Sequence, residues 1–153
     1  MANVLKASKT LGIVIALAQL VGVAAFVLGM HTMIGVLSTA LPTGQQEIRL
    51  RMGDPVVIPF NLNPRNEGFL EATLTVSLSL VADGGQVLAT DSATVTIPPG
   101  GTAPVNLELR MPMSQFQQQM EDPEPLSWVA DVRVTSLFDL ISFSNTMTVA
   151  GGA

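Results

Sequence analysis

The chain contains no cysteine in 153 residues, and its only histidine is His31. Disulfides, thiolate metal sites and cysteine nucleophiles are therefore excluded, while the redox compartment stays undetermined. No second histidine is available to complete a transition-metal site around His31. The sequence also lacks a glycine-rich phosphate loop between a strand and a helix, and a nucleophile elbow. We therefore expect a protein that is not an enzyme and binds no metal or cofactor.

Charged residues are also scarce, at 12% of the chain, and the mean hydropathy is +0.46. These values are too apolar for an ordinary soluble domain, so part of the chain is expected in lipid. From residue 45 onward, five arginines stand against twelve acidic residues, a formal balance of −7. A field of that sign repels nucleic acid and anionic membrane surfaces, so neither is an expected partner.

One long apolar run is present from Leu11 to Met30, "LGIVIALAQLVGVAAFVLGM". Its twenty residues match the roughly 20 that a helix needs to cross a bilayer. A cleaved signal sequence is the alternative, but its apolar region is only about 7–15 residues. The run continues as "TMIGVLSTAL" until Pro42 and Gly44 provide breakers. We therefore expect a retained anchor, with a helix that extends beyond the membrane or lies along its surface.

Charge placement predicts the topology. Lys6 and Lys9 are the only charges before Glu47, and basic residues beside a short tail favour its retention in the cytoplasm. The expected organisation is a cytoplasmic tail at residues 1–10, a transmembrane helix with its extension at 11–41, and an extracytoplasmic domain at 45–150. Membrane lipid is the first expected partner.

Beyond residue 45 the hydrophobic period changes to two, which is typical of β-strands. In one strand Leu74, Val76 and Leu78 share a parity expected in the core, and Thr75 and Ser77 share the opposite, wet face. The turn formers "DGG" and "PPGG" separate this strand from the next two. About seven strands are expected in total, and their segments are "EIRLRM", "VVIPFNL", 70–80, 87–97, 105–111, "SWVADVRV" and "ISFSNTMTV".

A short helix is expected in "SQFQQQM", capped by Ser114, with Phe116 and Met120 on one face. The fold class is therefore mainly β: a transmembrane helix followed by an immunoglobulin-like or fibronectin type III sandwich with one short helix. Pro59 predicts either an edge position or a bulge for its strand. Trp128 shares the inward parity of its strand, which favours a core position over a partner anchor.

Two groups of residues are candidates for contact. Small or polar residues in the apolar helix favour helix association, and these are Gly12, Gln19, Gly22 and Gly29. Asn63, Arg65 and Asn66 form a possible recognition loop, although such residues beside proline are usually turn formers.

The order "VVIPFNLNPRN", a long alternating strand, then "DGGQVLATDSATVTIPPGGTAPVNLEL" resembles the group 2 late-embryogenesis-abundant proteins with their water-stress and hypersensitive-response (WHy) domain. The likeness covers about residues 47–149 and lies in the turns. The resemblance implies a fibronectin-like sandwich without catalytic residues, found in archaea and bacteria behind an N-terminal anchor and linked to stress and desiccation tolerance.

Two other functions fit the same plan. A subunit of a pilus-like extracellular filament would bundle its apolar helices and coat them with sandwiches, although Lys6-Ala7 is a poor pilin processing site because Ser8 and charged Lys9 follow. An accessory subunit of a membrane complex would use the glycines and Gln19 as a helix interface. Self-association and a membrane protein complex are therefore the alternative partners.

Overall fold

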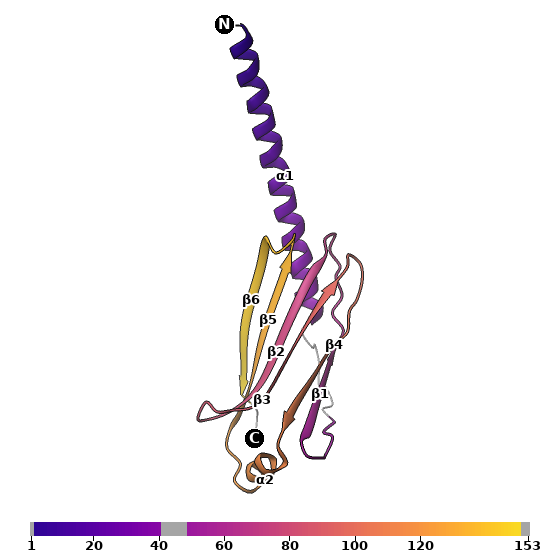
Figure 1. Ribbon diagram of the computed structural model, residues 1–153, viewed down its shortest axis with the longest axis vertical. Coiled ribbons are helices and arrows are strands. Elements are labelled where there is room, and N and C mark those ends of the chain that lie inside the picture. The colour runs from indigo at the N-terminus through magenta and orange to yellow at the C-terminus, as the bar shows by residue number, and fades with distance from the viewer. Residues whose placement is uncertain (1, 41–48, 151–153) are drawn as a thin grey trace.

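The computed structural model describes residues 2–40 and 49–150, as one long helix joined to a β-sandwich (Figure 1). The fold class predicted from sequence, mainly β with an N-terminal apolar helix and two antiparallel sheets, is confirmed. The elements in chain order are α1 (Ala2–Ala40), β1 (Val56–Leu62), β2 (Ala72–Ala82), β3 (Val87–Ile97), β4 (Val105–Met111), α2 (Met113–Glu121), β5 (Leu126–Ser136) and β6 (Ile141–Ala150).

The two sheets have the strand arrangement of an immunoglobulin-like sandwich. One sheet pairs β1 with β4, and the other has the order β3-β2-β5-β6. These correspond to the B–E pair and to the C–F–G strands with an added C′ edge strand. Of the segment "EIRLRM", predicted as a separate strand, residues 49–52 are described and make only an isolated bridge from Arg51 to Val57. The prediction of a strand there is wrong for these residues, because Gly53, Asp54 and Pro55 interrupt pairing so soon afterwards.

Alternation places the core as the sequence predicts. Ala72, Leu74 and Val76 of β2 are buried, whereas Leu78 is only partly buried. Every apolar position of β4 is buried between the sheets, namely Val105, Leu107, Leu109 and Met111. Pro59 lies in β1, a strand whose only strand partner in the described chain is β4. Its missing N–H therefore costs no strand pairing, which confirms the predicted edge position.

The hydroxyl face of β2 pairs with the same face of β3. Thr75 Oγ1 lies 3.0 Å from Thr94 Oγ1, and Ser79 Oγ lies 2.9 Å from Thr90 Oγ1. At the turn between these strands Gly85 has a φ of +79°, as the "DGG" signal predicts. These cross-strand hydroxyl pairs fix the register of the hairpin on its solvent side.

In β6, Phe143 and Val149 share the parity of Ile141 and Met147, which pack against the core. Phe143 and Val149 are 44% and 61% exposed. The reason is that β4 lies over the β3 side of the larger sheet, where Glu108 N donates to Asp91 Oδ2 at 2.7 Å. Two strands cannot cover four, so the β6 edge keeps part of its inward face open.

The short helix α2 begins one residue earlier than the predicted cap. Its N-cap is Pro112, without a side-chain bond, so the prediction of Ser114 as the cap is wrong. Asp54 Oδ1 instead accepts from the N–H of Met113 at 3.3 Å. Phe116 packs on the core, but Met120 is 72% exposed. The helix ends within one turn of Met120, which leaves its side chain beyond the sandwich.

Candidate functional site

The environment of α1 changes along its length. Nearly every side chain from residue 12 to residue 28 is exposed, including Ile13, Leu20 and Phe26. Beyond that point one stripe is buried, formed by Gly29, Thr32, Met33, Val36 and Ala40. The stripe has helical periodicity, so one face of the last three turns packs into the sandwich. Met33, Val36 and Ala40 join Leu74 and Leu107 in one core cluster.

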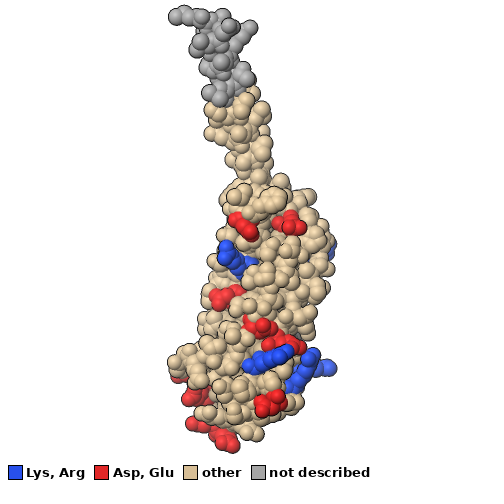
Figure 2. All heavy atoms as spheres, in the orientation of Figure 1, with Lys and Arg blue, Asp and Glu red and all other residues tan. Residues whose placement is uncertain are grey.

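The exposed part of α1 is long and apolar enough to cross a membrane, with the candidate span at Gly12–Ala40. A signal sequence would satisfy the same criterion. Figure 2 shows that the described part of the helix outside the sandwich carries no charged side chain on the visible face, whereas the sandwich carries both signs. The point where α1 enters the sandwich is therefore a sharp boundary between the exposed apolar segment of the helix and a domain with a charged surface.

Residues 63–68 form the loop that holds α1, and we call it the helix clamp. Thr39 Oγ1 donates to the carbonyl of Arg65 at 2.8 Å and accepts from the N–H of Arg65 at 2.9 Å. Gly35 faces Glu67, and a Cβ on Gly35 would lie 3.5 Å from the Glu67 Cβ. Gly68 packs directly against Thr32. The clamp thus follows α1 for two turns.

Asn66 organises the helix clamp from inside. Its side chain is fully buried, and its Nδ2 donates to the carbonyls of Leu70 at 2.7 Å and Ile97 at 3.0 Å. Its Oδ1 accepts from the N–H of Gly68 at 2.9 Å. Because the buried amide makes all these hydrogen bonds, its role is structural: it connects the loop to Leu70 and to Ile97 at the end of β3. Of the possible recognition loop, Asn63 and Arg65 are exposed, and Asn66 is committed to the protein interior.

The "PPGG" turn supports the helix clamp from the other side. Asn66 donates through its backbone N–H to the Gly101 carbonyl at 2.9 Å, and its own carbonyl accepts from the Gly100 N–H at 2.8 Å. Gly100 has a φ of +70°, which only glycine adopts readily. The "PPGG" turn and the helix clamp are therefore neighbours, joined by backbone hydrogen bonds.

Three exposed apolar side chains surround the entry point of α1, and we call them the apolar rim: Phe69, Phe138 and Leu140. Phe69 is 68% exposed and stacks on His31 of α1, with ring centroids 6.0 Å apart. Phe138 and Leu140, in the β5–β6 turn, are 100% and 77% exposed. This turn adjoins α1, because Ile141 contacts Gly29. An open hollow of about 300 Å³ separates Leu70 from Phe138.

The β5–β6 turn has an unusual backbone. Leu137, Phe138 and Asp139 all have positive φ, at 56°, 55° and 64°. Side chains with a Cβ are strained in that region. This site is not among those predicted above from the sequence, although "SLFDLIS" offers a signal. It is a loop between two strands that contains apolar residues instead of the usual glycine, asparagine or proline.

The four candidate helix-contact residues have different surroundings. A Cβ added to Gly12 or Gly22 would meet no neighbouring group within 4 Å, and Gln19 is exposed. Gly29 allows close approach of Ile141, whose Cδ1 would lie 2.5 Å from a Cβ at that position. One of the four therefore makes its contact within the chain, and the others remain on the free part of α1.

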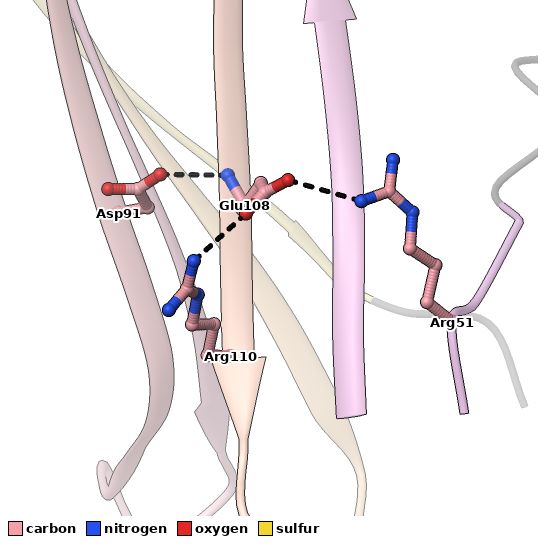
Figure 3. A network of polar contacts seen from close by, with 4 residues as sticks. All are labelled: Arg51, Asp91, Glu108 and Arg110. Carbon is pink, nitrogen blue, oxygen red and sulfur yellow. Dashed lines mark hydrogen bonds and ion pairs between the residues drawn. The ribbon is translucent and has the colours of Figure 1, made fainter. Parts of the chain in front are cut away.

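A group of charged residues joins the edges of the two sheets (Figure 3). Glu108 of β4 pairs with Arg51 at 3.3 Å and with Arg110 at 3.1 Å, and its N–H bonds to Asp91 of β3. The arginine side chains are 69% and 65% exposed. Such open ion pairs contribute little, so the Asp91 contact between sheets is the main structural link here.

Within the described residues no group of three histidine, aspartate or glutamate side chains could hold a metal ion.

Trp128 is half-buried and meets Phe60 edge to face, with ring centroids 5.4 Å apart. It packs against the second core cluster, which contains Leu80 and Leu109. This agrees with the expected structural role of Trp128.

No family model matches the chain, and no curated protein matches it. Among solved structures, a putative β-galactosidase from Bacteroides fragilis has a TM-score of 0.47 and 17% identity, covering 67% of this chain and 15% of that one. A protein from Archaeoglobus fulgidus has a TM-score of 0.47 and 13% identity over 71% of this chain and 94% of that one. A β-glucuronidase from glycoside hydrolase family 2 has a TM-score of 0.42 and 13% identity, covering 66% of this chain and 11% of that one. The chain thus spans a small fraction of the two glycosidases, and these weak likenesses assign it no family or activity.

Proposed function

We propose that this protein is a non-catalytic β-sandwich, anchored in a membrane by α1, which acts by contact outside the cytoplasm. The observation that carries the proposal is the continuity of α1: one helix passes without a linker from a fully exposed apolar segment into the core of the sandwich. A rigid connection of this kind holds the domain directly at the surface where the apolar segment ends.

The buried end of α1 limits where a signal sequence could be cleaved. Cleavage just after the apolar run would separate the sandwich from the membrane, and cleavage further on would remove Met33 or Val36 from the core. Burying such side chains contributes roughly 1.5–3 kcal/mol each. The stability of the sandwich itself therefore disfavours cleavage within the buried end of α1, whereas a cut just after Met30 would leave these side chains in place.

The proposed orientation follows from Lys6 and Lys9, which favour a cytoplasmic N-terminus. Protein contact is the proposed mode of action because the charged cluster around Glu108 is open at the surface of the sandwich. Among the described residues, no group of three histidine, aspartate or glutamate side chains could hold a metal ion. The WHy-like turns support a role in envelope stress or desiccation tolerance by analogy of fold.

The contact role is tested with the full chain reconstituted in lipid vesicles. We expect it to slow aggregation of a client protein during heating or drying. A variant with a disrupted core, Leu74→Asp, should lose the effect, whereas Val87→Asp, at an exposed position, should keep it. Equal protection by the two variants, or none by the folded native chain, would contradict the stress role.

A filament subunit is the second candidate, and β6 favours it. This edge strand of ten residues carries no charge and no proline, and such edges promote association between chains. The exposed apolar part of α1 would then bundle with its copies in the filament. Electron microscopy of the native membrane fraction distinguishes ordered filaments from dispersed chains. Recovery in a fixed-ratio complex with another protein would instead favour an accessory subunit.

A further inference from the structure

We propose that the apolar rim inserts into the lipid bilayer beside α1, so that the sandwich stands on the membrane in one fixed orientation. The inference rests on the proposed anchor and adds a second, independent lipid contact made by Phe69, Phe138 and Leu140. Three observations carry it: the level of the rim, its direction and the surface with which it is continuous.

The level follows from the length of the apolar run. Twenty helical residues from Leu11 to Met30 span about 30 Å, which is the thickness of the hydrocarbon core. With Lys9 at one surface of the bilayer, the other surface falls near Met30. The sandwich makes its contacts with α1 at this same level, through Gly29 with Ile141 and His31 with Phe69. No length of helix is left to separate the domain from the lipid.

The direction follows from the strand order. Ile141 is the first residue of β6 and contacts Gly29, so the β5–β6 turn lies beyond that contact. In Figure 1 the turn points along α1 toward its N-terminal end. Phe138 and Leu140 are therefore carried by the end of the sandwich at which α1 leaves it, next to the contact of Ile141 with Gly29.

The rim is continuous with the lipid-facing surface of α1. Phe69 stacks on His31, which follows exposed Met30 and the exposed apolar residues before it. A fully exposed phenylalanine on a strained turn contributes no favourable free energy in water. The transfer of the same side chain from water into hydrocarbon is favourable. Phe138 also has a positive φ of 55°, and backbone strain of this kind is common at functional positions.

The charges around the rim decide which lipid it fits. Glu67, Glu71 and Asp139 are its close neighbours in the chain and are exposed, so an anionic surface would repel them. The rim thus suits a bilayer of zwitterionic lipid, entered through apolar contact with the acyl chains and without headgroup recognition.

The test places single tryptophans in the full chain, in a Trp128→Phe background, reconstituted in phosphatidylcholine vesicles that contain lipids brominated on their acyl chains. The rim variant is Phe138→Trp. The anchor variant is Phe26→Trp, on the exposed part of α1. The control variant is Val87→Trp, an exposed position beside the β2–β3 turn at the far end of the sandwich (Figure 1). Circular dichroism establishes that all three are folded.

We expect bromine to quench the tryptophan fluorescence of the rim and anchor variants and to leave that of the control variant unaffected. Quenching in the anchor variant without quenching in the rim variant would overturn the rim contact and leave the anchor intact. If the emission of the unquenched rim variant is also blue-shifted, its tryptophan is buried against a second copy of the chain and not in lipid.

The remaining outcomes concern the anchor and the orientation. An anchor variant that bromine does not quench would overturn the membrane anchor itself. Equal quenching in the control and rim variants would mean a domain lying on its side, which contradicts the fixed upright orientation.

Discussion

Gly68 of the helix clamp lies so close to Thr32 of α1 that a Cβ added to it would stand 2.5 Å from the Thr32 Cα. Because that atom belongs to a helix backbone, it cannot move aside as a flexible side chain would. The contact joins the sandwich to the helix at the level where the apolar segment ends.

Gly68→Ala should therefore destabilise the junction by about 1–3 kcal/mol, the usual cost of an overpacked core. Urea unfolding of the full chain in detergent, followed by Trp128 fluorescence, measures the effect. Gly84→Ala is the matched control, since nothing lies within 4 Å of its added Cβ. Equal unfolding midpoints for the two variants would mean that the Gly68 contact is not tight.

Asn66→Ala should cost about 1–3 kcal/mol, because it leaves the buried carbonyls of Leu70 and Ile97 without their donor. Asn63→Ala, on the exposed part of the same loop, should change stability by less than about 0.5 kcal/mol. Thermal unfolding compares the two. A small effect at Asn66 would show that water replaces the lost amide.

Leu74→Ala should cost about 2–5 kcal/mol, as a large-to-small change at a position with no exposure. Thr75→Ala, on the opposite face of β2, loses only the exposed pair with Thr94 and should cost less than about 1 kcal/mol. Denaturant midpoints measure both. Similar large losses at both positions would indicate that the hydroxyl face is packed against another subunit.

A fragment that begins at Gln45 should be less stable than one that begins at Leu28, because the shorter fragment lacks Met33, Val36 and Ala40 of the core cluster. Hydrogen exchange should show the loss first at β2 and β5, whose buried residues contact this part of the core. Identical protection in the two fragments would mean that the end of α1 is dispensable for the sandwich.

Alternation and turn chemistry made the strands predictable, since Leu74 and Leu109 are buried at the positions that their parity indicates. Long-range packing was not accessible in the same way. Leu78 has the same parity as Leu74 but is only partly buried, between the two core clusters, and Phe143 is exposed on the β6 edge. Parity specifies a face, and the area that the opposite sheet covers decides burial.

The junction was only partly predictable. The continuation of the apolar run to Ala40 indicated a longer helix, but its packing depends on Gly68 meeting Thr32, which lies far away in the sequence. The role of Asn66 likewise depends on Ile97 from a distant strand end. The apolar rim had a local signal in the composition of the β5–β6 turn, and its significance appears only when the turn is placed beside α1.

Labelling of introduced cysteines in intact cells tests the central claim most directly, because the native chain has no cysteine. Val87→Cys lies at an exposed site of the sandwich, and Ser8→Cys lies between Lys6 and Lys9 in the sequence. With a membrane-impermeant maleimide, we expect Val87→Cys to react in intact cells and Ser8→Cys to react only after lysis, both in a membrane-bound chain of full length. Reaction of Ser8→Cys alone in intact cells would reverse the topology, and release of a shortened Val87→Cys chain from the membrane would contradict the retained anchor.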